Sequence, residues 1–225
     1  MKILFNDVIQ YADVPKNLKS PALTEVYDIK DKIEFDLDKP RLINSIGIGN
    51  INKNDFSVTF IDKNNGKVDF PFCEKGVFAN GLYVMDTALE VSSIKITANT
   101  HIGRFAAGIA VNIPTSVAKE PAFHSTAKPR TTLSGQVIQG VGGHIYKTVS
   151  LDSRYKIDET AMKEIENGYF YTSMGYPFFI DLSDEAYKLP FSKLYAIDRN
   201  QQQMSFESGV NRFLYSRRFE LEERF

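Results

Sequence analysis

The segment 212–223 alternates between apolar and polar residues, and this alternation constrains the fold more than any other feature of the chain. Phe213, Tyr215, Phe219 and Leu221 share one parity. A period of two residues is typical of a strand with one buried face. The sequence therefore predicts a closing strand within a sheet, whose outer face is charged and open to a neighbouring subunit. The candidate interface residues on that outer face are Arg212, Arg218, Glu220 and Glu222.

Length, charge and cysteine content narrow the class of protein. A chain of 225 residues forms one large β domain or two domains of about 100 residues each, and we favour two. Its 27 Lys and Arg residues nearly cancel its 28 Asp and Glu residues, so we expect no nucleic-acid partner. A single cysteine, Cys73, and three scattered histidines predict neither a disulfide framework nor a metal site, and no cofactor is expected.

Targeting signals are not expected either. The apolar start of the chain meets Asn6 and Asp7 too early for the apolar region of a signal peptide. No stretch of the sequence approaches the roughly 20 apolar residues of a membrane-spanning helix. We therefore expect a protein that is made in the cytoplasm and kept soluble there, and that reaches any external location by a route other than secretion.

The first half of the sequence reads as a series of short strands. Alternation over 33–38, 57–60 and 94–97 predicts three strands with one wet face each. The run 62–67 contains an Asn-Gly step, which favours a hairpin turn because both residues tolerate positive φ. Strands at spacings of roughly ten residues, punctuated by prolines such as Pro40, indicate a sandwich or jelly roll.

A change of composition predicts a domain boundary near the middle of the chain. Several prolines and small residues gather between 114 and 131, as in linkers. We assign residues 1–118 to a β-sandwich, 119–130 to the linker and 131–225 to a small β barrel. That barrel is expected to contain a strand at 144–151 and one short helix at 158–167. Asp158 is the expected cap of the helix, and Asn167 with Gly168 is its expected end.

Two further patterns allow a binding or a packing interpretation. The aromatic runs 169–171 and 176–182 would suit stacking on a sugar or a base, but the shared parity of Phe178, Ile180 and Leu182 favours a packed strand. The glycine-containing run 134–143 lacks the spacing of a phosphate-binding loop. We therefore predict a flexible loop or a hairpin there.

The sequence offers no compact catalytic motif. His101, His124 and His144 lie in three separate segments, and none belongs to a nucleophile motif. Two groups of carboxylates would suit paired acids for glycoside hydrolysis, but their expected positions on turns and on the wet face of a strand favour solvated surface. The two groups are Asp181, Asp184 and Glu185, and Glu220, Glu222 and Glu223. We therefore expect a protein that is not an enzyme.

The order of the segments resembles a family of tailed-bacteriophage virion proteins from the tail tip, the distal ring or the adaptor region. The segments that carry the resemblance are 32–37, 43–50, 93–96, 102–108, 130–136 leading to Tyr146, 175–181, 194–196 and 218–223. In this family a β-sandwich of galactose-binding type is followed by a small β barrel that one helix interrupts. The resemblance implies a structural subunit that forms or joins a ring in the tail tip, baseplate or neck of the virion.

The resemblance implies two kinds of partner: copies of the chain itself and other virion tail proteins. Such rings form from heterologous contacts that close after a fixed rotation. The alternative is a carbohydrate-binding module for host-surface glycans, with Tyr27, Tyr83 or the segment 70–72 near its site. A ring would then amplify weak binding of one sugar per subunit. The lack of Trp counts modestly against this alternative, because Trp is a favoured stacking face.

Overall fold

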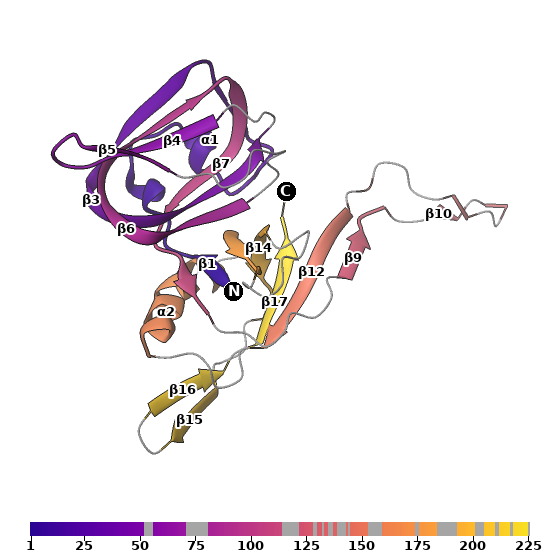
Figure 1. Cartoon of the computed structure of the whole chain (residues 1–225). Helices are drawn as coiled ribbons and strands as arrows, with labels where there is room; N and C mark the ends of the chain where they lie inside the picture. The colour runs from indigo at the N-terminus through magenta and orange to yellow at the C-terminus, as the bar shows by residue number, and fades with distance from the viewer. Residues whose placement is uncertain are drawn as a thin grey trace.

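The computed structural model describes residues 1–51, 56–70, 81–113, 122–127, 130–131, 133–134, 137–138, 143, 145–152, 159–173, 176–183, 193–200, 205–209, 212–216 and 218–224. The chain is mainly β, as predicted, with two large antiparallel sheets and two short two-stranded ones. Figure 1 shows the first large sheet curled around the N-terminal segment, with the second sheet directly beside it.

The first large sheet has six strands in the order β2-β7-β3-β6-β4-β5, and we call it the six-stranded sheet. All of its strands come from one continuous part of the chain. They are β2 (Tyr27–Ile29), β3 (Lys32–Ile51), β4 (Phe56–Ile61), β5 (Lys67–Asp69), β6 (Gly81–Ala98) and β7 (Thr100–Gly108). The three predicted strands at 33–38, 57–60 and 94–97 fall within β3, β4 and β6 respectively.

Strands β3 and β6 are far longer than the short strands that the sequence predicted. Each continues through a bend, and the register between them shifts between Asp36 and Arg41 and again between Ile43 and Ser45. Such irregularities bend a strand and increase its twist. Pro40, which we had read as an interruption, lies inside β3 at the first shift, where a missing N–H breaks no regular ladder bond.

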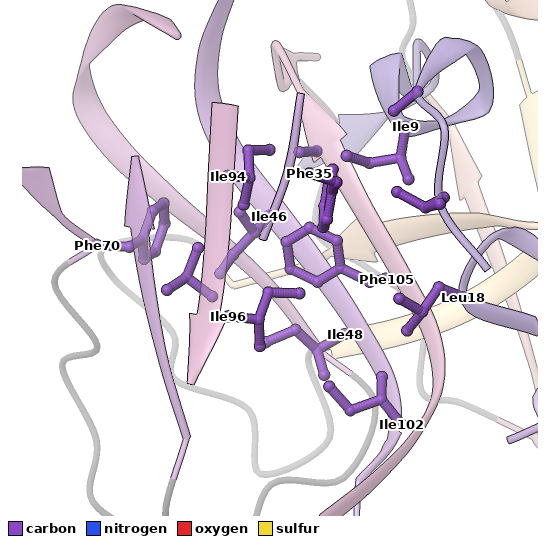
Figure 2. Packing of buried hydrophobic residues seen from close by; sticks show 14 of the residues in the cluster. Ile9, Leu18, Phe35, Ile46, Ile48, Phe70, Ile94, Ile96, Ile102 and Phe105 are labelled. Carbon is purple, nitrogen blue, oxygen red and sulfur yellow. The ribbon is translucent and has the colours of Figure 1, made fainter. Parts of the chain in front are cut away.

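The concave side of the six-stranded sheet is filled by the beginning of the chain. A 3-10 helix, η1 (Val8–Tyr11), and a short helix, α1 (Lys16–Lys19), contribute Ile9 and Leu18 to the first core cluster. Figure 2 shows these two side chains packed toward Phe35 and Phe105, whose rings meet edge to face at 6.4 Å. The six-stranded sheet therefore completes its core with the segment that directly precedes it in the sequence.

The predicted hairpin is confirmed. Strands β4 and β5 pair with Phe60 opposite Val68. Asn65 adopts a φ of 62°, and the Asp62 carboxylate accepts hydrogen bonds from the backbone N–H groups of Asn64 and Gly66. An acidic side chain that bonds its own turn in this way fixes the turn locally.

The second large sheet has seven strands in the order β8-β1-β13-β14-β17-β12-β9, and we call it the seven-stranded sheet. It draws strands from both ends of the chain. They are β1 (Lys2–Leu4), β8 (Val111–Asn112), β9 (Ala122–Ser125), β12 (Ile145–Asp152), β13 (Phe178–Asp181), β14 (Lys193–Asp198) and β17 (Arg218–Glu223). Strands β1 and β8 belong to the range predicted for the first domain, and β9 falls within the range predicted as linker.

The central strands of the seven-stranded sheet are buried on both faces. Phe178 and Ile180 point into the second core cluster, whereas Phe179 packs with Leu4 and Tyr195 against the six-stranded sheet. The predicted parity of 178, 180 and 182 is therefore only part of the pattern, because the other face of β13 is also covered. Phe179 lies so close to Gly47 that a Cβ on Gly47 would collide with the ring.

Helix α2 (Glu159–Ser173) covers the other face and contributes Ala161 and Ile165 to the second core cluster. The predicted helix is present, but its predicted end is wrong, because the helix continues through Asn167 and Gly168 to Ser173. Gly168 is a packing glycine: a Cβ there would collide with the ring of Phe5. The predicted cap, Asp158, lies outside the described residues.

The closing segment forms two strands instead of the single strand predicted. Strand β16 (Arg212–Ser216) pairs with β15 (Ser205–Gly209) in a separate hairpin, and only β17 joins the seven-stranded sheet. Within β17 the predicted alternation is confirmed, since Phe219 and Leu221 are buried while Arg218 and Glu220 are exposed.

The predicted β barrel is not closed in the described part of the chain. The strand order of the seven-stranded sheet runs from β8 to β9, and these two strands do not pair with each other. A further hairpin of β10 (Arg130–Thr131) and β11 (Val137–Ile138) leads away from β9. Figure 1 shows this hairpin and the β15–β16 hairpin projecting from the body on different sides. The glycine-containing run 134–143 thus includes one strand of a hairpin, as predicted.

Candidate functional site

A cavity of about 180 Å³ opens where the two large sheets meet, and we call it the seam cavity. Its walls come from the start of the chain, from β7, from the segment that enters β13 and from β14. Pockets between packed units of a fold are common positions for ligand sites. Its lining combines several aromatic rings with the charged side chains of Asp7 and Arg104.

The polar wall of the seam cavity is built around a buried ion pair. Asp7 precedes η1 and accepts a hydrogen bond from Ile9 N–H at 3.0 Å, which is the usual work of a helix N-cap. The same carboxylate accepts from Ala107 N–H on β7 at 3.1 Å and from Arg104 Nη2 at 2.5 Å. Gln10 Nε2 donates to it as well, at 3.3 Å. Asp7 therefore ties the N-terminal segment to β7.

Arg104 is only 6% exposed, and its charge is neutralised by Asp7. Its Nη1 lies 3.5 Å from the Ser20 carbonyl oxygen, while its buried Nε has no hydrogen-bond partner among the described residues. A buried charge is tolerated when it is paired and hydrogen-bonded. The main role of the Asp7–Arg104 pair is thus structural. Because the two charges cancel, the polar wall carries no net charge.

Tyr195 lies behind this pair and is almost fully buried. Burial raises the pKa of its phenol, the positive charge of Arg104 lowers it and the negative charge of Asp7 raises it further. Its hydroxyl donates to the Pro21 carbonyl oxygen at 3.0 Å. The phenol therefore stays protonated at physiological pH and acts as a hydrogen-bond donor, not as a base.

The predicted interface residues lie on the face of the seven-stranded sheet that carries Phe179 and Tyr195. Glu222 is opposite Ile197 of β14, which has the parity of Tyr195, and Arg218 and Glu220 follow the same parity along β17. The six-stranded sheet covers the β13–β14 part of this face, and the β17 part is solvated. The fourth residue, Arg212, is on β16 instead, and its side chain lies outside the described residues.

Charge pairs cover the β17 part of that face. Arg199 donates two hydrogen bonds of 2.9 Å to the Glu222 carboxylate. These bonds hold the pKa of Glu222 below its usual range, and the charges of Arg224 and His124 lower it further. Arg218 Nε donates to Ser150 Oγ at 3.2 Å and lies 3.5 Å from Glu220. This surface is a network of satisfied charges, the usual composition of a polar interface or of solvated surface.

The opposite face of the same flank carries apolar side chains that are buried near the core and exposed at its end. By flank we mean β17, β12 and β9. Val149 and Leu151 of β12 are buried in the second core cluster, and Ile145 has the same parity. Phe123 of β9 is opposite Lys147, which places it on this face too. Ile145 is 66% and Phe123 57% exposed, so apolar side chains reach solvent on this face beyond the Lys147–Glu223 ion pair that borders the core.

The aromatic residues that sequence reasoning offered for glycan binding are mostly packed. Tyr27 and Tyr83 are half-buried against the first core cluster, and Phe70 meets Phe60 edge to face. The rest of the segment 70–72 lies outside the described residues, as do the side chains of 169–171. Tyr176 is the exception, since it is 46% exposed and lines the seam cavity.

The candidate catalytic sets are not brought together in the described part of the chain. His101 lies on β7 and His124 on β9 of the other sheet, while His144 is outside the described residues. Asp181 accepts hydrogen bonds from the backbone and hydroxyl of Ser183, and its predicted partners Asp184 and Glu185 are outside. No group of three or more His, Cys, Asp or Glu suited to a metal ion occurs among the residues described.

The helices bear on membrane crossing. In the part of the chain that the structure describes, none is both long and apolar enough to span a bilayer.

Sequence reasoning missed the seam cavity and its ion pair. One signal was present: Arg104 is the single charge in the run 102–108, which otherwise reads as a buried strand. A charge within such a run requires a buried partner. The partner, Asp7, is 97 residues away, and nothing in the local pattern identifies it.

Comparisons with known proteins leave the family open. No family model matches the chain, and no curated protein matches it. A solved structure described as "CpGH89CBM32-6 produced by Clostridium perfringens" is similar to part of the chain, with 11% identity and a TM-score of 0.38. The similarity covers 45% of this chain and 98% of that one. At this TM-score it carries no argument about fold or function.

Proposed function

We propose that this chain is a non-enzymatic structural subunit of a tailed-phage virion, which forms or joins a ring in the tail tip, the baseplate or the neck. Its partners are copies of itself and other tail proteins. The observation that carries the proposal is the flank of the seven-stranded sheet, where Ile145 and Phe123 stay exposed on the face that is buried nearer the core.

The flank has exposed apolar residues of the kind found in protein interfaces. Ile145 and Phe123 continue the face that is buried at Val149 and Leu151, and Leu133 at the β10–β11 hairpin is fully exposed. Ile145 and Phe123 are diagonal neighbours across β12 and β9, and neighbouring exposed apolar side chains mark interaction sites on soluble proteins. The charged pairs of β17 lie on the opposite face of the sheet, and any contact made through that face would be polar.

The seven-stranded sheet also ends in two different strands. Its order begins with β8 and ends with β9, and in the described part neither has a second neighbour. An edge strand presents unpaired N–H and C=O groups to other chains. Two unlike edges favour a head-to-tail contact, and a head-to-tail contact that closes produces a ring.

The finer fold assignment belongs to the same proposal. We infer that the six-stranded sheet with its N-terminal filling corresponds to a β-sandwich of galactose-binding or jelly-roll type. The seven-stranded sheet with α2 corresponds to the small β barrel that follows it. The support is the order of the segments and the single helix, which covers one face of that sheet.

The oligomeric state of two matched variants tests the proposal. Ile145→Asp combined with Phe123→Asp places charges on the exposed apolar part of the flank, where neither side chain takes part in a core cluster. Leu42→Asp is the control, because Leu42 is 60% exposed on β3 of the other sheet. We expect native mass spectrometry to show a ring of wild-type subunits, monomers for the double variant and an intact ring for Leu42→Asp.

Circular dichroism of the three proteins must accompany this experiment, because only variants with unchanged melting are informative about the interface. A double variant that melts like the wild type and still assembles would contradict the proposal. The proposal would also be contradicted if the wild-type chain stayed monomeric at every concentration and did not bind the proteins encoded beside it.

A further inference from the structure

The seam cavity has the size of a single six-membered ring. Its volume is about 180 Å³, and a cavity of roughly 150 Å³ is enough to hold one benzene molecule. It is open to solvent at Tyr176, which is 46% exposed. A ligand of one ring can therefore enter without opening the packed seam between the sheets.

One wall of the cavity is aromatic. The ring centroids of Phe5 and Phe178 are 5.1 Å apart with their planes tilted by 47°, and Tyr176 and Pro177 also line the cavity. Phe178 is fixed by the second core cluster and Phe5 by its contact with Gly168 of α2. Phe5 and Phe178 are almost fully buried, so the half-exposed Tyr176 is the ring of this wall that can offer its face to the C–H groups of a flat or chair-shaped ring.

The other wall is polar but uncharged in sum. Arg104 and Asp7 neutralise each other, and Gln10 Nε2 is committed to Asp7 and to the Lys19 carbonyl oxygen. Gln10 Oε1 accepts no hydrogen bond from the described residues, and Arg104 Nη1 has only its long contact of 3.5 Å with Ser20. The wall therefore offers one acceptor and one donor, and it discriminates against charged ligands.

An aromatic wall facing a neutral hydrogen-bonding wall matches the two sides of a pyranose, which has an apolar C–H face and an edge of hydroxyl groups. We propose that the seam cavity binds one pyranose unit of a neutral saccharide, with its C–H face on the aromatic wall and its hydroxyls toward Gln10 and Arg104. This site is separate from the residues 27, 70–72 and 83 considered above, and it includes the start of the aromatic run 176–182. It does not depend on whether the chain forms a ring.

Saturation-transfer NMR and calorimetric titration with glucose, galactose and N-acetylglucosamine test the proposal. We expect at least one of these sugars to bind with a Kd of about 1 mM, the affinity that about a dozen non-hydrogen atoms reach at ordinary ligand efficiency. Tyr176→Ala should weaken binding by about tenfold, because it removes a stacking face. Tyr176→Phe keeps the ring and should bind nearly as the wild type does.

Tyr11→Ala is the matched control. Tyr11 is also a half-exposed tyrosine near η1, but its ring faces the Arg41 guanidinium at 5.3 Å and does not line the cavity. This variant should bind sugar with unchanged affinity. Absence of saturation transfer from all three sugars would overturn the proposal, and so would equal affinities of Tyr176→Ala and Tyr11→Ala.

Discussion

The two large sheets bury their apolar faces in different ways. The six-stranded sheet comes from residues 27–108, curls, and fills its concave side with η1 and α1. The seven-stranded sheet collects strands from both ends of the chain, is buried on both faces at its centre and leaves one flank in solvent. The first sheet thus builds its core almost entirely from neighbouring parts of the chain. The second sheet needs strands from distant parts of the chain, and part of its surface stays exposed for a partner.

The largest effect expected from a single change is in the core of the seven-stranded sheet. Phe219→Asp places a charge at a position that is 1% exposed and has no partner for it. We expect a loss of about 5 kcal/mol in the free energy of unfolding, or no folded second core at all. Urea unfolding followed by circular dichroism measures this.

The control for Phe219→Asp is Glu220→Gln on the same strand, whose side chain points to solvent and should change stability by less than about 0.5 kcal/mol. Equal losses in the two variants would contradict the assignment of one buried and one solvated face to β17, and a larger loss for Glu220→Gln would reverse it.

The next largest effect is expected at the ion pair that joins the N-terminal segment to β7. Arg104→Met leaves the Asp7 carboxylate buried without its cation and should cost about 3 to 4 kcal/mol. The double variant Asp7→Asn with Arg104→Met should recover part of this loss, because no uncompensated charge remains. Additive losses in the double-mutant cycle would contradict the coupling of the two residues.

The seam between the sheets is tested at Gly47. Gly47→Ala directs a methyl group into the ring of Phe179, and we expect overpacking to cost about 2 kcal/mol. Phe179→Leu in the same chain should relieve part of the clash, and its effect on stability should be smaller in the Gly47→Ala background than alone. If the two changes were independent, the sheets would not be in contact as described.

A smaller effect is expected from the Glu222–Arg199 pair when the pH changes. The folded-state pKa of Glu222 is lowered, so its contribution is present above the pKa of the unfolded chain and is lost as pH falls through the folded-state value. The pair is partly solvated, and its contribution should not exceed about 1 kcal/mol. Glu222→Gln should therefore flatten the acid side of the stability profile, and an unchanged profile would contradict this.

The smallest effect on stability is predicted for Arg218→Glu. Arg218 is exposed and pairs only at the surface, so its replacement should change the free energy of unfolding by less than about 0.5 kcal/mol. If β17 lies in a subunit contact, the same change should damage assembly. Thermal melting combined with native mass spectrometry separates the two readouts, and a large drop in melting temperature would show that Arg218 has a structural role instead.

What the sequence could predict follows the same division between the sheets. The turn at 62–67 and the strands around Phe35, Val58 and Ile96 depend on local signals, and the structure confirms them. The alternation of Phe219 and Leu221 predicted a half-buried strand correctly, because β17 has one solvated face.

The rest depended on contacts between distant residues. Gly168 looks like a helix end, yet it continues α2 because Phe5 occupies the space of its missing side chain. Phe179 breaks the expected parity of β13 because a second sheet covers it. The seam cavity joins residues from 4 to 195, and no local pattern can predict a site assembled over that separation.

Electron microscopy of the purified chain tests the central claim, assembly through the flank of the seven-stranded sheet, most directly. We predict two-dimensional class averages that show a closed ring, in which the β9–β12 flank of each subunit meets its neighbour. Single separate particles at all concentrations, with and without the proteins encoded beside this one, would contradict the claim.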